Sequence, residues 1–199
     1  TLASSVAAYG FINNEDNKTI KTLYGAYKLC NENLANVYWN NNKISSVCLR
    51  PGIVTGLGRD QGMTSKTTLA ILAAVLNKSY TIPFSGIISN LHAAEAASAF
   101  IHSISFECNG SYCFDLNGPS IDVINLKNLI NKFIPSSSIK INGEPLKFPG
   151  KLSDSPLRNF IKSNSLNYIS ISPEEATLDT ITSFKKLLVE NKISSVDLN

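Results

Sequence analysis

The stretch "LYGAYKLCNENLANVYW", residues 23–39, decides how this sequence is interpreted. It carries a tyrosine and a lysine four residues apart, Tyr24 and Lys28. Four residues are about one turn of an α-helix, so the two side chains leave the same face. The pattern predicts a helix over residues 22–40 that ends at a run of asparagines. We expect its buried side chains to include Leu23, Tyr27, Leu34, Val37 and Tyr38.

Strand and helix patterns alternate along the rest of the chain. Patterns typical of strands lie in residues 1–10 ("TLASSVAAYG", a strand end that runs into a loop), 44–52 ("ISSVCLRPG") and 111–118 ("SYCFDLNG"). Helical patterns lie in residues 68–76, 91–104 and 123–134, and from about Pro173 onward. Strands that alternate with helices predict an α/β fold with a parallel sheet.

The composition is that of a globular protein, since 43% of the 199 residues are apolar and 17% are charged. A net charge of +3 with scattered lysines does not indicate nucleic-acid binding. No apolar run approaches the ~18 residues that a membrane span requires, and residues 1–9 lack the features of a secretory signal. We therefore expect a cytoplasmic protein that binds neither nucleic acid nor membranes.

The four cysteines are expected to be free, buried thiols in a reducing compartment; they are Cys30, Cys48, Cys108 and Cys113. Only Cys108 and Cys113 are close in sequence, and their spacing fits neither a zinc site nor a redox CxxC motif. We predict no metal site.

A phenol beside an ammonium group is suited to proton transfer. A free tyrosine has a pKa near ~10, which makes it a poor base at neutral pH. An ammonium group one turn away favours the phenolate form and brings the phenol toward the range that is useful for proton transfer. The hydroxyl of Ser5, at a neighbouring strand end, could hold a substrate oxygen in line. Taken alone, the Y-x-x-x-K spacing is weak evidence, because such pairs also arise by chance on helix surfaces.

Four motifs in a fixed order carry a wider resemblance: "SSVAAYG" (residues 4–10), "YGAYK" (24–28), "LRPGIVTGLGR" (49–59) and "LHAAEA" (91–96). Together they resemble the extended short-chain dehydrogenase/reductase family, and within it the NAD-dependent epimerase/dehydratase group. In that family a strand ends in S-S-x-x-x-Y-G, a helix carries Y-x-x-x-K, and the next strand ends in R-P-x-x-V-Y-G. The resemblance implies the C-terminal portion of a Rossmann-like parallel sheet with a small α+β substrate-binding subdomain.

The resemblance also assigns roles to individual residues. Ser5 matches the catalytic serine or threonine, Tyr24 the acid/base and Lys28 its partner. Positions that bind NAD or NADP match Tyr24, Lys28, Pro51, Gly52, Ile53 and Val54. Positions that contact substrate match Ser5, Ala7, Arg59, Asp60 and Gln61, of which the last three could equally form a solvated turn. We expect Glu32 to anchor its helix, and His92 to be structural.

The chain departs from the family pattern at several points. Its sequence contains no GxxGxxG turn, the element that binds the pyrophosphate of NAD at a helix N-terminus. We therefore interpret it as the C-terminal part of a longer enzyme. Ile53 stands where nucleotide-sugar epimerases commonly have asparagine, which weakens the case for a UDP-sugar. Ala7 and Ala8 stand where a dehydratase normally has an acidic pair.

The function implied by the resemblance is an NAD(P)-dependent oxidoreductase acting on a hydroxyl of a sugar, sugar acid or nucleotide sugar. Epimerases and dehydrogenases share the first half-reaction, so both stay open. The alternative is a non-catalytic scaffold of the same family that binds a partner. A homodimer through the Tyr24 helix is also implied. The implied division assigns residues 1–56 and 88–134 to the Rossmann-type core, and residues 57–87 and 135–199 to the substrate-binding subdomain.

Overall fold

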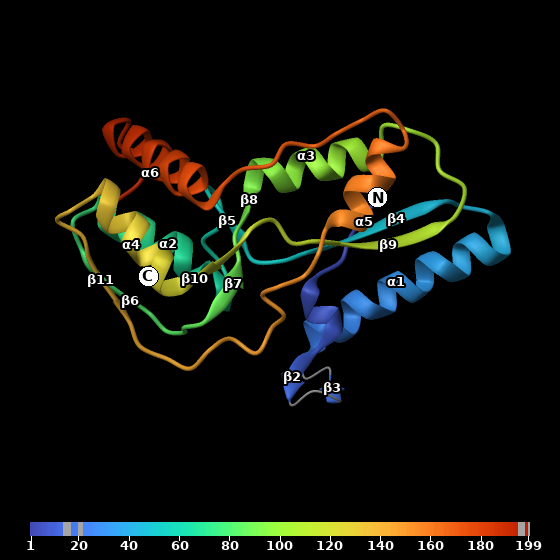
Figure 1. Cartoon of the computed structure of the whole chain (residues 1–199), viewed down its shortest axis with the longest axis horizontal. Coiled ribbons are helices and arrows are strands. Elements are labelled where there is room, and N and C mark those ends of the chain that lie inside the picture. The colour runs from blue at the N-terminus through green and yellow to red at the C-terminus, as the bar shows by residue number, and fades with distance from the viewer. Residues whose placement is uncertain (14–16, 20–21, 195–197, 199) are drawn as a thin grey trace. The chain divides into compact units, whose positions relative to one another are not determined.

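The computed structural model describes residues 1–13, 17–19, 22–194 and 198 (Figure 1). The chain divides into two compact units. Unit 1 comprises Thr1–Gly52, Ala94–Gly118 and Lys147–Ser170, and unit 2 comprises Ile53–Ala93, Pro119–Leu146 and Ile171–Asn199.

Unit 1 is built on a three-stranded parallel sheet in the order β1-β4-β9. Its strands are β1 (Leu2–Ala3), β4 (Ser46–Pro51) and β9 (Ser111–Leu116). A 3-10 helix, η1 (Val6–Tyr9), follows β1, and a short hairpin of β2 (Phe11–Asn13) and β3 (Asn17–Thr19) precedes the helix α1 (Leu23–Asn42). The remaining helices are α3 (Ala93–Ser103), which begins at the unit boundary, and α5 (Ser155–Lys162). Parallel strands connected through helices confirm the predicted α/β class.

The two faces of the unit 1 sheet differ in character. On β4, Ser46, Cys48 and Arg50 share one face, and their register partners on β9 are Ser111, Cys113 and Asp115. This polar face lies toward α1, because Glu32 of α1 bonds to Arg50. The opposite face is apolar: Leu49 is fully buried there, and the ring of Phe114 lies 4.9 Å from that of Phe160 in α5. The helix that carries Tyr24 therefore packs on polar side chains.

The helix α1 extends two residues beyond its predicted end, but the prediction of its buried side chains was wrong. All five of those side chains are exposed: Leu23, Tyr27, Leu34, Val37 and Tyr38. The buried positions are Gly25, Glu32 and Ala35. The reason is the surface on which the helix packs. Glu32 bonds to Arg50 on the polar sheet face, and Gly25 contacts the backbone of Ala7. Such a surface does not accommodate a stripe of large apolar side chains.

Unit 2 contains three two-stranded sheets. The strands β5 (Val54–Thr55) and β8 (Leu91–His92) pair in parallel, as do β6 (Ser79–Ile82) and β11 (Ser138–Ile141). The strands β7 (Ile87–Ser89) and β10 (Ser120–Asp122) pair antiparallel. The helical elements are η2 (Met63–Ser65), α2 (Lys66–Val75), α4 (Val123–Phe133) and α6 (Pro173–Val189).

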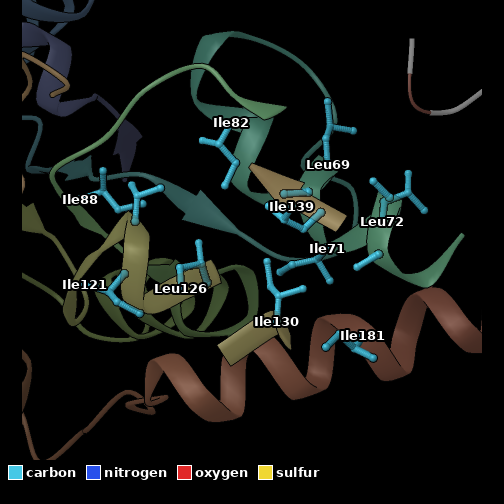
Figure 2. Close-up of a cluster of buried hydrophobic side chains, with 14 of the residues drawn as sticks. Leu69, Ile71, Leu72, Ile82, Ile88, Ile121, Leu126, Ile130, Ile139 and Ile181 are labelled. Carbon is cyan, nitrogen blue, oxygen red and sulfur yellow. The ribbon is translucent and has the colours of Figure 1, made fainter. Parts of the chain in front are cut away.

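The core of unit 2 is mostly aliphatic, with Phe84 and Phe184 among its buried members (Figure 2). Ile71 of α2, Ile82 of β6, Leu126 of α4 and Ile181 of α6 all belong to this one cluster, and each is nearly or fully buried. The predicted core helix over residues 68–76 is confirmed, since α2 is buried at every position from Thr67 to Ala74. The last helix begins at Pro173 as predicted, within a capping box formed by Ser172 and Glu175.

The compact units and the predicted division assign four segments differently: residues 53–56, 88–93, 119–134 and 147–170. Residues 119–134 lie in unit 2, where β10 pairs with β7 and α4 packs against α6. Residues 147–170 lie in unit 1, where α5 packs against β9. Among the described residues, no helix is both long and apolar enough to cross a membrane. All four cysteines are free, but the prediction that they are buried was wrong for Cys30 and Cys113, which are exposed.

Candidate active site

Ser5 lies where β1 ends and η1 begins. It is the N-cap of η1, and its Oγ accepts a hydrogen bond of 3.1 Å from the backbone N–H of Ala7. The side chain is half-buried. Since the oxygen accepts from the backbone, the hydroxyl proton can be donated to another oxygen. The loop therefore holds Ser5 in place, and its O–H group can still donate a hydrogen bond to a substrate.

Tyr24 and Lys28 lie on the first two turns of α1. The helix begins at Thr22, whose Oγ1 accepts a 3.0 Å hydrogen bond from the N–H of Gly25. The ammonium nitrogen of Lys28 lies 5.4 Å from the centre of the Tyr24 ring, so the two side chains share a face as the spacing predicted. Tyr24 is 56% exposed. Its phenol can thus be reached by a small molecule.

Lys28 also ties α1 to the sheet. Its Nζ donates a 2.6 Å hydrogen bond to the carbonyl oxygen of Ala3, the last residue of β1. Ser5 follows two residues later. This bond uses one of the three ammonium protons and leaves two for other acceptors.

A buried ion pair holds the middle of α1. Arg50 of β4 donates from Nε to Glu32 Oε1 at 2.8 Å and from its terminal nitrogen to Oε2 at 2.6 Å. Ser4 donates a third hydrogen bond to the same carboxylate. Burial acts to raise the pKa of Glu32, but the hydrogen bonds from Arg50 and Ser4 and the charge of Arg50 lower it, so the pKa lies below its ordinary value. Glu32 anchors the helix, as the sequence indicated.

The same polar network continues through the Arg50 guanidinium, which stacks 4.4 Å from the centre of the Tyr9 ring. The Tyr9 hydroxyl donates to the Asp115 carboxylate at 3.0 Å. Burial is the main cause that raises the pKa of Tyr9, and the charge of Asp115 adds to it. Sequence reasoning assigned no role to Arg50, Tyr9 or Asp115, although Tyr9 and Arg50 stand within the motifs that carry the resemblance.

The other predicted site residues belong mostly to unit 2. In unit 1, Pro51 ends β4 and Gly52 follows it, and the N–H of Gly52 donates to Leu116 O at 2.9 Å. Ile53 is buried, and Val54 begins β5. In the following loop, Arg59 donates to Gln61 O at 2.7 Å and to Thr64 Oγ1 at 2.8 Å, while Asp60 and Gln61 are exposed. Unit 1 therefore brings together Ser5, Ala7, Tyr24 and Lys28, and the Arg59 loop is a separate feature of unit 2.

Comparison with solved structures relates this fold to a set of enzymes. A partial-consensus L-threonine 3-dehydrogenase superposes with a TM-score of 0.75 at 18% identity, covering 92% of this chain and 65% of that one. UDP-N-acetylglucosamine 4-epimerase from Bacillus cereus gives 0.72 at 17% identity, covering 98% of this chain and 65% of that one. UDP-glucose 4-epimerase from Thermus thermophilus, solved in complex with NAD, gives 0.70 at 17% identity, covering 92% of this chain and 63% of that one.

The chain has the fold of the extended short-chain dehydrogenase/reductases. The resemblance that the four motifs indicated is thus confirmed at the level of the fold. The chain spans about 65% of the length of the first of these relatives. No protein-family model matches the sequence, and no curated protein matches it.

NAD is the cofactor that this fold implies, and the residues present fit one half of it. Lys28 donates one ammonium proton to the Ala3 carbonyl and has two left for a ligand. The exposed Tyr24 phenol lies next to Lys28. Such donors suit the hydroxyls of the nicotinamide ribose. The sequence contains no GxxGxxG turn to hold the pyrophosphate, so the fit concerns the nicotinamide end alone.

Proposed function

We propose that the protein carrying this chain is an NAD(P)-dependent oxidoreductase of the epimerase or dehydrogenase type. Its substrate would be a sugar, a sugar acid or a nucleotide sugar with an oxidisable hydroxyl. The observation that carries the proposal is the grouping of Ser5, Tyr24 and Lys28 at the junction of β1, η1 and α1, with Lys28 bonded to the Ala3 carbonyl. The matching fold adds support, since its relatives include dehydrogenases and epimerases.

Each of the three residues would have a distinct part in the reaction. Ser5 donates its free proton to the substrate oxygen and orients it. Tyr24 takes the proton of that hydroxyl as the carbon is oxidised, and returns a proton on reduction. Lys28 uses its remaining ammonium protons to hold the ribose. A bound nicotinamide supplies the acceptor and donor of hydride.

We propose that unit 1 is the carboxyl-terminal portion of a Rossmann-like sheet, and that Pro51, Gly52, Ile53 and Val54 pass the nicotinamide. Within unit 1, Ser5 and Ala7 would contact substrate. For Arg59, Asp60 and Gln61 of unit 2, contact with substrate is a separate proposal. Arg59 donates two hydrogen bonds within its loop. A guanidinium has five N–H donors, so Arg59 can still bind a carboxylate or a phosphate.

Replacement of Tyr24 by phenylalanine tests the role of the phenol. General acid–base catalysis contributes about 100- to 10,000-fold, so Y24F should lower turnover by at least about 100-fold in the protein that carries this chain. NAD affinity, measured by titration, should change little because the ring remains. Tyr27→Phe is the matched control, since Tyr27 is exposed on the same helix. Turnover by Y24F at the wild-type rate would refute the proposed function.

A second candidate is a non-catalytic scaffold of the same fold that binds a partner. Such a protein would keep the fold of unit 1 but would neither bind NAD nor turn over a sugar. NAD titration of the protein that carries this chain separates the two, since saturable binding excludes the scaffold role.

We further propose a homodimer through α1. Large side chains along this helix are exposed at 48–75% of their area; they are Leu23, Tyr27, Leu34, Val37 and Tyr38. Exposed apolar surface of this kind is typical of an interface. Analytical ultracentrifugation of Leu34→Lys should show a shift toward monomer, with Asn33→Lys on the same helix as the control. A monomeric wild type would contradict the proposal.

A further inference from the structure

The first turn of α1 contacts the backbone of η1 at Gly25. A Cβ atom built at Gly25 would lie closer than 3.0 Å to the carbonyl oxygen of Ala7 and 3.1 Å from its carbonyl carbon. Thr22 Oγ1 would also lie at 3.1 Å. The nearest obstacle is thus backbone, which cannot rotate away as a long side chain does. Only glycine fits this contact without moving η1.

Glycine at this position has no backbone reason. Gly25 is not among the described glycines with positive φ, and it lies within regular helix. Inside a helix, glycine is less favourable than alanine by about 1 kcal/mol. The close approach of the Ala7 peptide is the feature that explains it.

Ala7, whose carbonyl group contacts Gly25, also holds the Ser5 hydroxyl. Its N–H donates to Ser5 Oγ at 3.1 Å, and its carbonyl oxygen accepts from the N–H of Gly10 at 3.1 Å. On the helix side, Tyr24 immediately precedes Gly25. The contact therefore joins the loop that orients one proposed catalytic group to the turn that carries the other.

We propose that Gly25 is a positioning residue, whose missing side chain sets the distance between the Ser5 hydroxyl and the Tyr24 phenol. Both groups must reach the same substrate oxygen, and a Cβ at position 25 would push η1, with Ser5, away from α1. A misplacement of about 1 Å can cost about 100-fold in rate. This inference rests on the proposed function. It adds to the candidate site a residue, Gly25, that contacts neither substrate nor cofactor.

Gly25→Ala tests the inference, with Asn33→Ala as the matched control because Asn33 is exposed on the same helix. We expect G25A to lower kcat by about 100-fold, with KM and NAD affinity little changed. Amide hydrogen exchange at Ala7 and Gly10 should become faster, since both N–H groups are bonded within the displaced loop. N33A should change none of these quantities.

The double variant Y24F/G25A separates positioning from a general loss of structure. If Gly25 acts through the placement of Tyr24 and Ser5, G25A should add little to the loss caused by Y24F alone. Equal kcat in G25A and wild type, or a G25A chain that does not fold, would overturn the positioning role. A folded wild type that turns over no sugar alcohol would refute the proposed function instead. Exchange at Ala7 and Gly10 would then still decide whether Gly25 holds η1 in place.

Discussion

The helix α1 of unit 1 and the helices α4 and α6 of unit 2 pack on different kinds of side chain. Under α1 in unit 1 lie a carboxylate, a guanidinium and a hydroxyl, those of Glu32, Arg50 and Ser4. Under α4 and α6 in unit 2 lie aliphatic groups such as Leu126 and Ile181. Hydrogen bonds are directional and fix where a helix sits, whereas apolar burial stabilises without fixing an orientation as strictly. The candidate catalytic groups belong to the unit whose packing is directional.

The difference has an energetic side as well. An intact buried ion pair contributes little net stability, because desolvation offsets the attraction, but breaking it leaves a buried charge without a partner. Buried leucine and isoleucine side chains each contribute about 1.5–3 kcal/mol by leaving water. Unit 1 is therefore expected to be specified by its polar contacts, and unit 2 to be stabilised by its core.

Glu32→Ala should give the largest loss of stability. It leaves Arg50 without its carboxylate, and the expected cost is about 3–5 kcal/mol in the free energy of unfolding. Trp39 is the single tryptophan of the chain and lies in α1, so its fluorescence during urea denaturation reports on unit 1. A loss below about 1 kcal/mol would contradict the role given to the pair.

Glu32→Gln provides the pH test of the same pair. Hydrogen bonds and charge hold the pKa of Glu32 below its ordinary value of 4.5, against the effect of burial. A carboxyl whose pKa is lowered by folding contributes stability above its unfolded pKa and loses it as the pH falls through the folded value. Wild-type unit 1 should thus lose stability as the pH falls below about 4.5, and E32Q should lack that part of the loss.

Leu126→Ala should give a smaller loss, confined to unit 2. Leu126 is fully buried in the aliphatic cluster, and removing its side chain should cost about 3 kcal/mol. Amide hydrogen exchange in α4 and α6 should report the loss. An equal shift of the Trp39 transition would show that the two units unfold together.

Lys132→Ala gives the control for charge in unit 2. Lys132 and Glu174 form an ion pair of 2.6 Å, but both side chains are more than half exposed. Such pairs contribute about 0–1 kcal/mol, so the exchange pattern should hardly change. A loss as large as that of L126A would remove the contrast drawn between the units.

Much of the fold could be read from local patterns. The α/β class, the buried helix after residue 65, the helix that begins at Pro173 and the shared face of Tyr24 and Lys28 all follow from spacing within short segments. The placement of Ser5 at a strand end also follows from the local sequence. The prediction of the inward face of α1 was wrong, because hydrophobicity alone does not reveal a polar sheet face beneath a helix.

What the sequence determined by itself is therefore the spacing of the candidate catalytic groups and the order of the elements. Only the tertiary structure decided that Glu32 meets Arg50, that the Ala7 peptide rests on Gly25, and that residues 147–170 pack in unit 1. The physical reason is range: helical and strand periodicity act over a few residues, whereas these contacts join segments far apart in the chain and depend on which surfaces meet.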